Sequence, residues 1–180
     1  MILSHAILTA PPAHNYEELL NNFLTEKKAR EERLYKETQL NTFLSDLGYT
    51  ESSNNPYAYN TLGYIGEWQF GEAALIDAGY SHVCRERFIS DPTTEFSRTD
   101  QRDAMLRLMD NNYAALADLI EQYEGTAPHG VTITKSGVLA AAHLAGAHGV
   151  RQYILTGTDR RDAYGTRLTD YLYRFAGYEF

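Results

Sequence analysis

The sequence lacks several features on which common protein functions depend. It has one cysteine, Cys84, among 180 residues, which excludes an intrachain disulfide and a zinc site built from cysteines. No run of about 18 apolar residues occurs, so we expect no membrane-spanning helix. Lys and Arg number 16 against 24 Asp and Glu, a formal net charge of −8, and there is no basic block. We therefore expect no nucleic-acid partner, because phosphate binding requires concentrated positive charge.

Several catalytic motifs are absent as well. No His-Glu-x-x-His or comparable ligand spacing occurs, so we expect no metal and no other cofactor. There is no Gly-rich phosphate loop and no Gly-x-Ser-x-Gly elbow, which leaves nucleotide chemistry and serine hydrolysis without support. The N-terminal segment lacks the basic region and the apolar stretch of a classical signal peptide.

What the sequence contains fits a globular protein rich in tyrosine. The apolar fraction of 43% and the length suit one buried core. Residues 1–14 are predicted to be an N-terminal arm, and residues 15–180 a single catalytic domain. Fourteen Tyr, seven Phe and one Trp suit either a wet groove for a sugar chain or a Tyr-rich core.

Apolar spacing predicts a mainly α fold of the α+β class. Helices are expected at 15–24, 40–51, 72–77, 100–123, 137–145, 147–155 and 166–175. The charged stretch 25–33 is predicted to be a solvated helix face or a helix that joins two packed ends, and 85–99 to be irregular. The alanine-rich helix 137–145 should pack against 100–123. Turn formers among aromatic residues predict a loop at 53–70, with at most a short β-hairpin.

Glu51 is the leading candidate for a catalytic group. It falls at the C-terminal end of a predicted helix, where the negative end of the dipole disfavours a carboxylate. If Tyr49 and Trp68 shield it from water, desolvation acts in the same direction. Both effects favour a protonated carboxylic acid, which a general acid requires. Trp68 itself suits a core position or a sugar platform.

Neighbouring residues can complete a site. Ser52 can bond the Glu51 carboxyl or hold the helix end, and Gln69 can present an amide that both donates and accepts. Gly63 and Gly66 allow the backbone to approach a ligand closely.

The order of these residues resembles a known catalytic segment. Glu51-Ser52-x-x-Asn55-Pro56-x-Ala58, followed by Gly63-x-x-Gly66-x-x-Gln69, is similar to that of goose-type lysozymes and soluble lytic transglycosylases. The string 63–77 resembles the peptidoglycan-degrading branch found in phage lysins and antibacterial effectors. The segment 141–150 resembles the transglycosylase Ala-Tyr-Asn-Ala-Gly segment, with His143 and Leu144 where Tyr and Asn usually stand.

The resemblance implies a lysozyme-like fold, with a short hairpin beside the substrate groove. It implies that Glu51 is the catalytic acid/base, and that Ser52, Tyr64, Gln69 and His143 bind substrate; His143 suits a core position as well. The second catalytic group stays open. Glu72 is the favoured carboxylate, although it also suits a helix-cap role, and Glu67, Asp77 and the N-acetyl group of the substrate are alternatives.

The predicted function is a muramidase that cleaves the β-1,4 bond between N-acetylmuramic acid and N-acetylglucosamine. The alternatives are a lytic transglycosylase that releases 1,6-anhydro products, and a non-catalytic peptidoglycan-binding component of a phage tail or secretion machine. A helical adaptor would require the motif to be accidental. The expected partners are glycan strands and, for an effector, a cognate immunity or inhibitor protein. We expect synthesis in the cytoplasm and action in the periplasm or on the cell wall, after lysis or specialised secretion.

Overall fold

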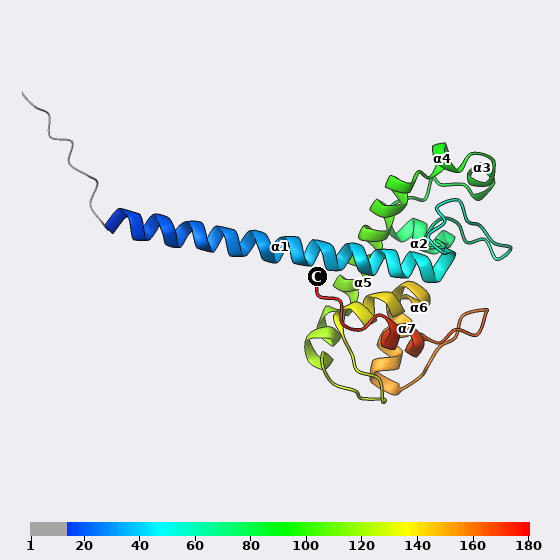
Figure 1. Ribbon diagram of the computed structural model, residues 1–180. Helices are drawn as coiled ribbons and strands as arrows, with labels where there is room; N and C mark the ends of the chain where they lie inside the picture. Colours follow the sequence, from blue (N-terminus) through cyan, green and yellow to red (C-terminus); the bar gives the residue numbers. More distant parts are fainter. Residues whose placement is uncertain (1–13) are drawn as a thin grey trace, which may run out of the picture. The chain divides into compact units, whose positions relative to one another are not determined.

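The chain is mainly helical, as its apolar spacing predicts. The computed structural model describes residues 14–180, so nearly all of the predicted N-terminal arm lies outside the described residues. Helices dominate the described residues (Figure 1). They make up 65% of the part of the chain that the structure describes. The helices are α1 (His14–Ser52), α2 (Glu72–Asp77), α3 (Arg85–Ser90), α4 (Pro92–Glu95), α5 (Arg98–Tyr123), α6 (Lys135–Thr156) and α7 (Leu168–Arg174). The chain divides into two compact units, residues 1–38 and 39–180.

The described part of the first unit is the N-terminal portion of α1. This helix continues without a break through the charged stretch 25–33, whereas the apolar spacing predicts separate helices on either side of it. Neither Gly nor Pro occurs from residue 14 to residue 47, so nothing interrupts the hydrogen-bond ladder. Two exposed ion pairs at i,i+4 spacing, Lys27–Glu31 and Glu32–Lys36, add modest support. The predicted solvated helix face is confirmed.

In the second unit, α6 packs against both α5 and α7. The predicted packing of the alanine-rich helix against the long helix is therefore confirmed. Gly146 has φ of 70° and ψ of 160°, which kinks α6 between the two helices expected from the sequence. Gly137 permits the close approach of α7, because a Cβ there would lie 2.6 Å from the carbonyl oxygen of Leu172. The core of this unit is apolar and aromatic, with Phe43 and Tyr153 among its largest buried side chains.

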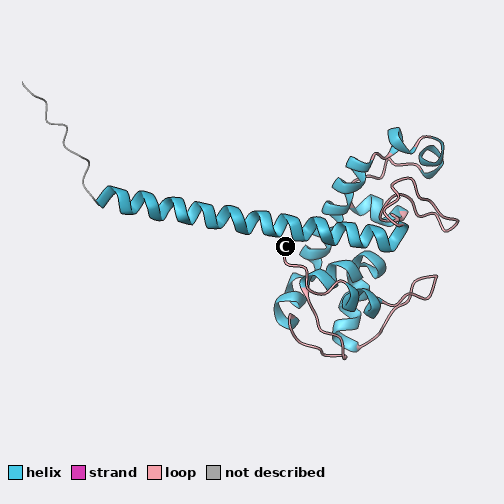
Figure 2. Cartoon of the chain, viewed as in Figure 1, coloured by secondary structure: helices cyan, strands magenta, loops and turns pink. Residues whose placement is uncertain are grey.

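The segments between α1 and α5 contain short elements. Two isolated antiparallel bridges, Tyr59–Ile65 and Ile65–Phe70, lie where a hairpin is expected, and no strand is formed within residues 14–180 (Figure 2). The prediction of an irregular segment at 85–99 is wrong, because this segment contains α3, α4 and the start of α5. Local capping forms α4: the Asp91 side chain accepts the N–H of Thr94, and Pro92 begins the helix.

Candidate functional site

Glu51 lies in the last turn of α1 and lines a cavity of 720 Å³. Its side chain is 15% exposed, so the carboxyl is largely shielded but reachable. The other residues that line this cavity come from the last turn of α1, from the 53–70 loop, and from α6, α7 and the segments beside them. They are Thr50, Asn60, Leu62, Tyr64, Gln69, Val131, His143, Leu144, Asp162, Ala163, Tyr164, Thr166, Thr169, Asp170, Tyr171, Tyr173 and Arg174. The structure therefore brings Glu51, Tyr64, Gln69 and His143 to one cavity.

The two carboxyl oxygens of Glu51 have different surroundings. The hydroxyl of Tyr171 donates a hydrogen bond to Oε1 at 2.5 Å, and Nε2 of His143 lies 4.0 Å from the same oxygen. No residue in the described part of the chain donates to Oε2. One oxygen is therefore held by the protein, and the other is open toward a ligand.

Tyr171, which holds Oε1 of Glu51, is a buried residue of α7. Burial raises the pKa of the Tyr171 phenol above its usual value. The negative charge of Glu51, the hydrogen bond to Glu51 and the charge of Asp162 raise it further, whereas Arg174 opposes them. Tyr171 therefore remains a protonated hydrogen-bond donor throughout the physiological range.

His143 occupies the wall of the cavity with a side chain that is 6% exposed. Its Nε2 lies 2.8 Å from the carbonyl oxygen of Trp68, and its ring packs edge-on against Phe70. Because a carbonyl only accepts, Nε2 carries the hydrogen, and the neutral ring then has an acceptor at Nδ1. That buried Nδ1 has no partner within the described residues. The sequence suits His143 to either a core or a groove position, and in the structure its side chain is largely buried and also lines the cavity.

Gln69 is held in an unusual backbone conformation. Its φ is +49°, in the left-handed region that few residues other than Gly, Asn and Asp adopt. Its side-chain Nε2 donates to the Gly66 carbonyl at 2.9 Å, and its Oε1 accepts from the Asn60 side chain at 3.0 Å. The amide is therefore oriented by the loop itself, which supports a functional reason for the backbone strain.

A second cavity, of 1070 Å³, adjoins the first. The two cavities share four lining residues, Leu62, Tyr64, Gln69 and His143. Glu72, which is exposed, lines only the second cavity, as do Asp77 and Cys84. The two cavities therefore adjoin at these four residues, and together they are called the groove below, with Glu51 in one part and Glu72 in the other.

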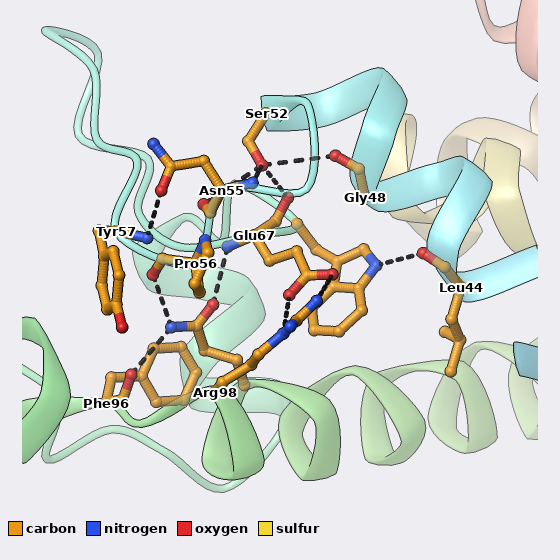
Figure 3. Close-up of polar contacts among 11 residues, drawn as sticks. Leu44, Gly48, Ser52, Asn55, Pro56, Tyr57, Glu67, Phe96 and Arg98 are labelled. Carbon is orange, nitrogen blue, oxygen red and sulfur yellow. Dashed lines mark hydrogen bonds and ion pairs between the residues drawn. The ribbon is translucent and has the colours of Figure 1, made fainter.

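Glu67 does not face this groove, contrary to one of the alternatives raised by the sequence. Its side chain is 4% exposed and accepts from Arg98 at 2.8 and 3.2 Å (Figure 3). The backbone N–H of Glu67 donates to Oε1 of the Gln101 side chain. This side chain lies close to Gly66, because a Cβ at position 66 would be 2.6 Å from the same oxygen of Gln101. The Glu67–Arg98 pair therefore fixes the loop against α5.

Ser52 holds the end of α1, which is one of its two predicted roles. Its hydroxyl donates to the Glu67 carbonyl at 2.7 Å and accepts the N–H of Asn55 at 3.0 Å (Figure 3). Ser52 lines neither part of the groove. The structure thus places Ser52 behind Glu51, where it positions the loop.

The expected shield of Glu51 is formed by other residues. Tyr49 is 66% exposed and lines neither cavity. Trp68 is a core residue, and its indole N–H donates to the carbonyl of Leu44 at 2.9 Å. Tyr171 and His143 instead lie beside the carboxyl.

Sequence reasoning missed the residues that the C-terminal segments bring to the site. Tyr171 follows Glu51 by 120 residues, so no local spacing connects them. Asp162, Tyr164 and Arg174 line the same cavity, and no motif distinguishes them. An unusually tyrosine-rich composition was the one available signal.

Two absences concern only the part of the chain that the structure describes. Across residues 14–180, no group of three or more His, Cys, Asp or Glu side chains is arranged to hold a metal ion. No helix in this range combines the length and the apolar character needed to cross a membrane.

Comparison with family models, with curated proteins and with solved structures finds no match to the chain.

Proposed function

We propose that the chain cleaves the β-1,4 bond between N-acetylmuramic acid and N-acetylglucosamine in peptidoglycan, with Glu51 as general acid. The observation that carries the proposal is the position of Glu51, largely shielded in the groove with Oε1 held by Tyr171 and Oε2 open. A general acid must meet the glycosidic oxygen in a fixed geometry, and this arrangement suits that task. We include in the proposal a lysozyme-like fold, in which the 53–70 loop takes the place of the hairpin.

The groove suits a polymer of sugars. The two cavities adjoin at four shared residues, and this supports a glycan that extends past Glu51 toward Glu72. Three tyrosines with exposed rings, Tyr64, Tyr164 and Tyr173, line the part that contains Glu51. Tyrosine combines an apolar ring face with a hydroxyl, which suits the mixed surface of a sugar. Gln69 and Asn60 add oriented amides that can bond sugar hydroxyl and N-acetyl groups.

The proposed reaction begins with proton transfer from Glu51 to the glycosidic oxygen. The C1–O bond then breaks, and its electron pair stays on the departing oxygen. The positively charged C1 centre is captured in one of two ways. Water gives a reducing end, whereas the C6 hydroxyl of the same muramic acid gives a 1,6-anhydro product. In either case the attacking oxygen loses its proton to a base or to solvent, and Glu51 is protonated again for the next cycle. Tyr171 keeps the carboxyl oriented by donating to Oε1.

The test compares purified wild type, Glu51→Gln and Glu121→Gln in a turbidity assay on purified peptidoglycan. Glu121 is an exposed residue of α5 that lines neither cavity, so its substitution is a matched control. We expect Glu51→Gln to lose at least about 100-fold in rate, because an amide is too weak an acid. Full lysis by Glu51→Gln would contradict the proposal. If the wild type binds peptidoglycan and releases no soluble sugar, a wall-binding component is supported instead.

A further inference from the structure

The loop between α6 and α7 brings a carboxylate to the Glu51 cavity that the sequence analysis did not consider. Residues 162–164 and 166 line this cavity together with Glu51. Asp162 is partly buried there. The loop is closed on itself, since an antiparallel bridge joins Arg161 to Arg167 and the Asp162 N–H donates to the Thr166 carbonyl at 3.0 Å.

The Asp162 carboxylate is fixed through one oxygen. Its Oδ1 accepts the backbone N–H groups of Tyr164 at 2.9 Å and Thr166 at 2.8 Å. No residue of the described chain donates to Oδ2, and Asp162 has no ion-pair partner within residues 14–180. As with Glu51, one oxygen is held by the protein and the other is open.

The remaining carboxylates of the groove are less suited to act beside Glu51. Asp170 caps α7, where its Oδ2 accepts the N–H of Arg167, and it is exposed. Glu67 is paired with Arg98 outside the groove. Glu72 and Asp77 line only the adjoining cavity.

The surroundings of Tyr171 agree with the position of Asp162 in the Glu51 cavity. The Tyr171 hydroxyl contacts Glu51 at 2.5 Å. The negative charge of Asp162 contributes to the raised pKa of this same phenol. Asp162 therefore lies within electrostatic range of the atom that touches the Glu51 carboxyl.

We propose that Asp162 is the base that activates water in the hydrolysis carried out with Glu51, an inference that rests on the proposed function. Glu51 gives its proton to the glycosidic oxygen, and the C1–O bond breaks with its electron pair on that oxygen. Water forms the new bond to C1 and passes a proton to Oδ2 of Asp162. Exchange with solvent then returns a proton to Glu51 and removes one from Asp162, so the net reaction adds one water across the bond.

The experiment measures rates and products for the wild type, Asp162→Asn, Asp110→Asn and Glu51→Gln. Asparagine retains the oxygen that accepts the Tyr164 and Thr166 N–H groups, so the loop geometry is preserved. Asp110 is exposed on α5 and lines neither cavity, which makes it a matched control. The substrate is purified peptidoglycan, products are identified by mass spectrometry, and thermal melts check the fold.

We expect the wild type to release mainly reducing ends. Asp162→Asn should lower kcat by about 100-fold or more, since general-base catalysis contributes on that order, while KM stays within about twofold. Its remaining products should shift toward the 1,6-anhydro form, which is lighter by one water. A purely structural role would not change the product ratio.

The outcomes separate the two proposals. If Glu51→Gln is inactive and Asp162→Asn is as fast as the wild type, the assignment of Asp162 is wrong and the proposed function stands. A wild type that releases only 1,6-anhydro sugars also overturns the role of Asp162, because no water is then activated. A wild type that cleaves no glycan removes both proposals.

Discussion

At the residue scale, Tyr171 couples its own ionisation to the stability of the fold. Its phenol is buried beside Glu51, and burial followed by the charge of Glu51 raises its pKa. The folded chain therefore holds this proton more tightly than the unfolded chain, whose phenol has a pKa of about 10. The stabilising contribution is complete below about pH 10 and is lost as the pH rises toward the folded-state pKa.

Tyr171→Phe should accordingly reduce the alkaline loss of stability. We expect the wild type to lose more free energy of unfolding than Tyr171→Phe between about pH 8 and pH 11, because only the wild type carries this phenol. Urea unfolding at both pH values measures the difference. Tyr173→Phe is the control, since Tyr173 is 80% exposed. This variant should lose as much free energy of unfolding as the wild type. If the wild type and Tyr171→Phe lose the same free energy of unfolding between these pH values, the Tyr171 phenol does not cause the loss of stability at alkaline pH.

At the element scale, periodicity was sufficient for α5 and α6, divided α1 into two predicted helices, and was insufficient for the site. The positions of α5, α6 and the kink at Gly146 follow from apolar spacing and from glycine placement. The short helices α3 and α4 were missed because their polar stretch lacks apolar spacing. The Asp91 side chain caps α4, and Arg87 of α3 pairs with Glu95 of α4. Among the site residues, Gln69 was identified from a local motif, whereas Tyr171 depends on tertiary packing.

Helix α1 permits a comparison of one residue type in two environments. Phe43 is 0% exposed and packs against Phe175 at a centroid distance of 5.8 Å, whereas Phe23 is 62% exposed. We expect Phe43→Ala to cost about 3–5 kcal/mol of unfolding free energy. Phe23→Ala should change it by less than about 0.5 kcal/mol.

Chemical denaturation measures both variants. Tryptophan fluorescence follows the second unit, which contains Trp68 and Phe43, and circular dichroism follows the helix that contains Phe23. A large loss on Phe23→Ala would mean that this side chain is covered in solution.

At the scale of the whole molecule, the formal net charge of −8 should govern the response to salt. Peptidoglycan carries free carboxylates on its stem peptides, so the proposed substrate and the chain repel one another. The Debye length falls from about 30 Å at 0.01 M salt to about 8 Å at 0.15 M, which screens this repulsion.

Binding to purified peptidoglycan should therefore strengthen as NaCl is raised from about 10 to about 150 mM. A sedimentation assay measures the bound fraction at each salt concentration. Chitin, an uncharged glycan, is the control and should show little change. Binding that weakens with salt would indicate that a local positive patch dominates over the net charge.

The solitary thiol of Cys84 makes the groove observable. Cys84 is partly buried on the wall of the adjoining cavity, and its thiol donates to the Glu86 carboxylate at 3.1 Å. Because the chain has no other cysteine, a maleimide dye attaches at this single position in the unmodified sequence. The fluorophore would then sit where an incoming glycan displaces water, so its emission reports occupancy in real time without a mutation.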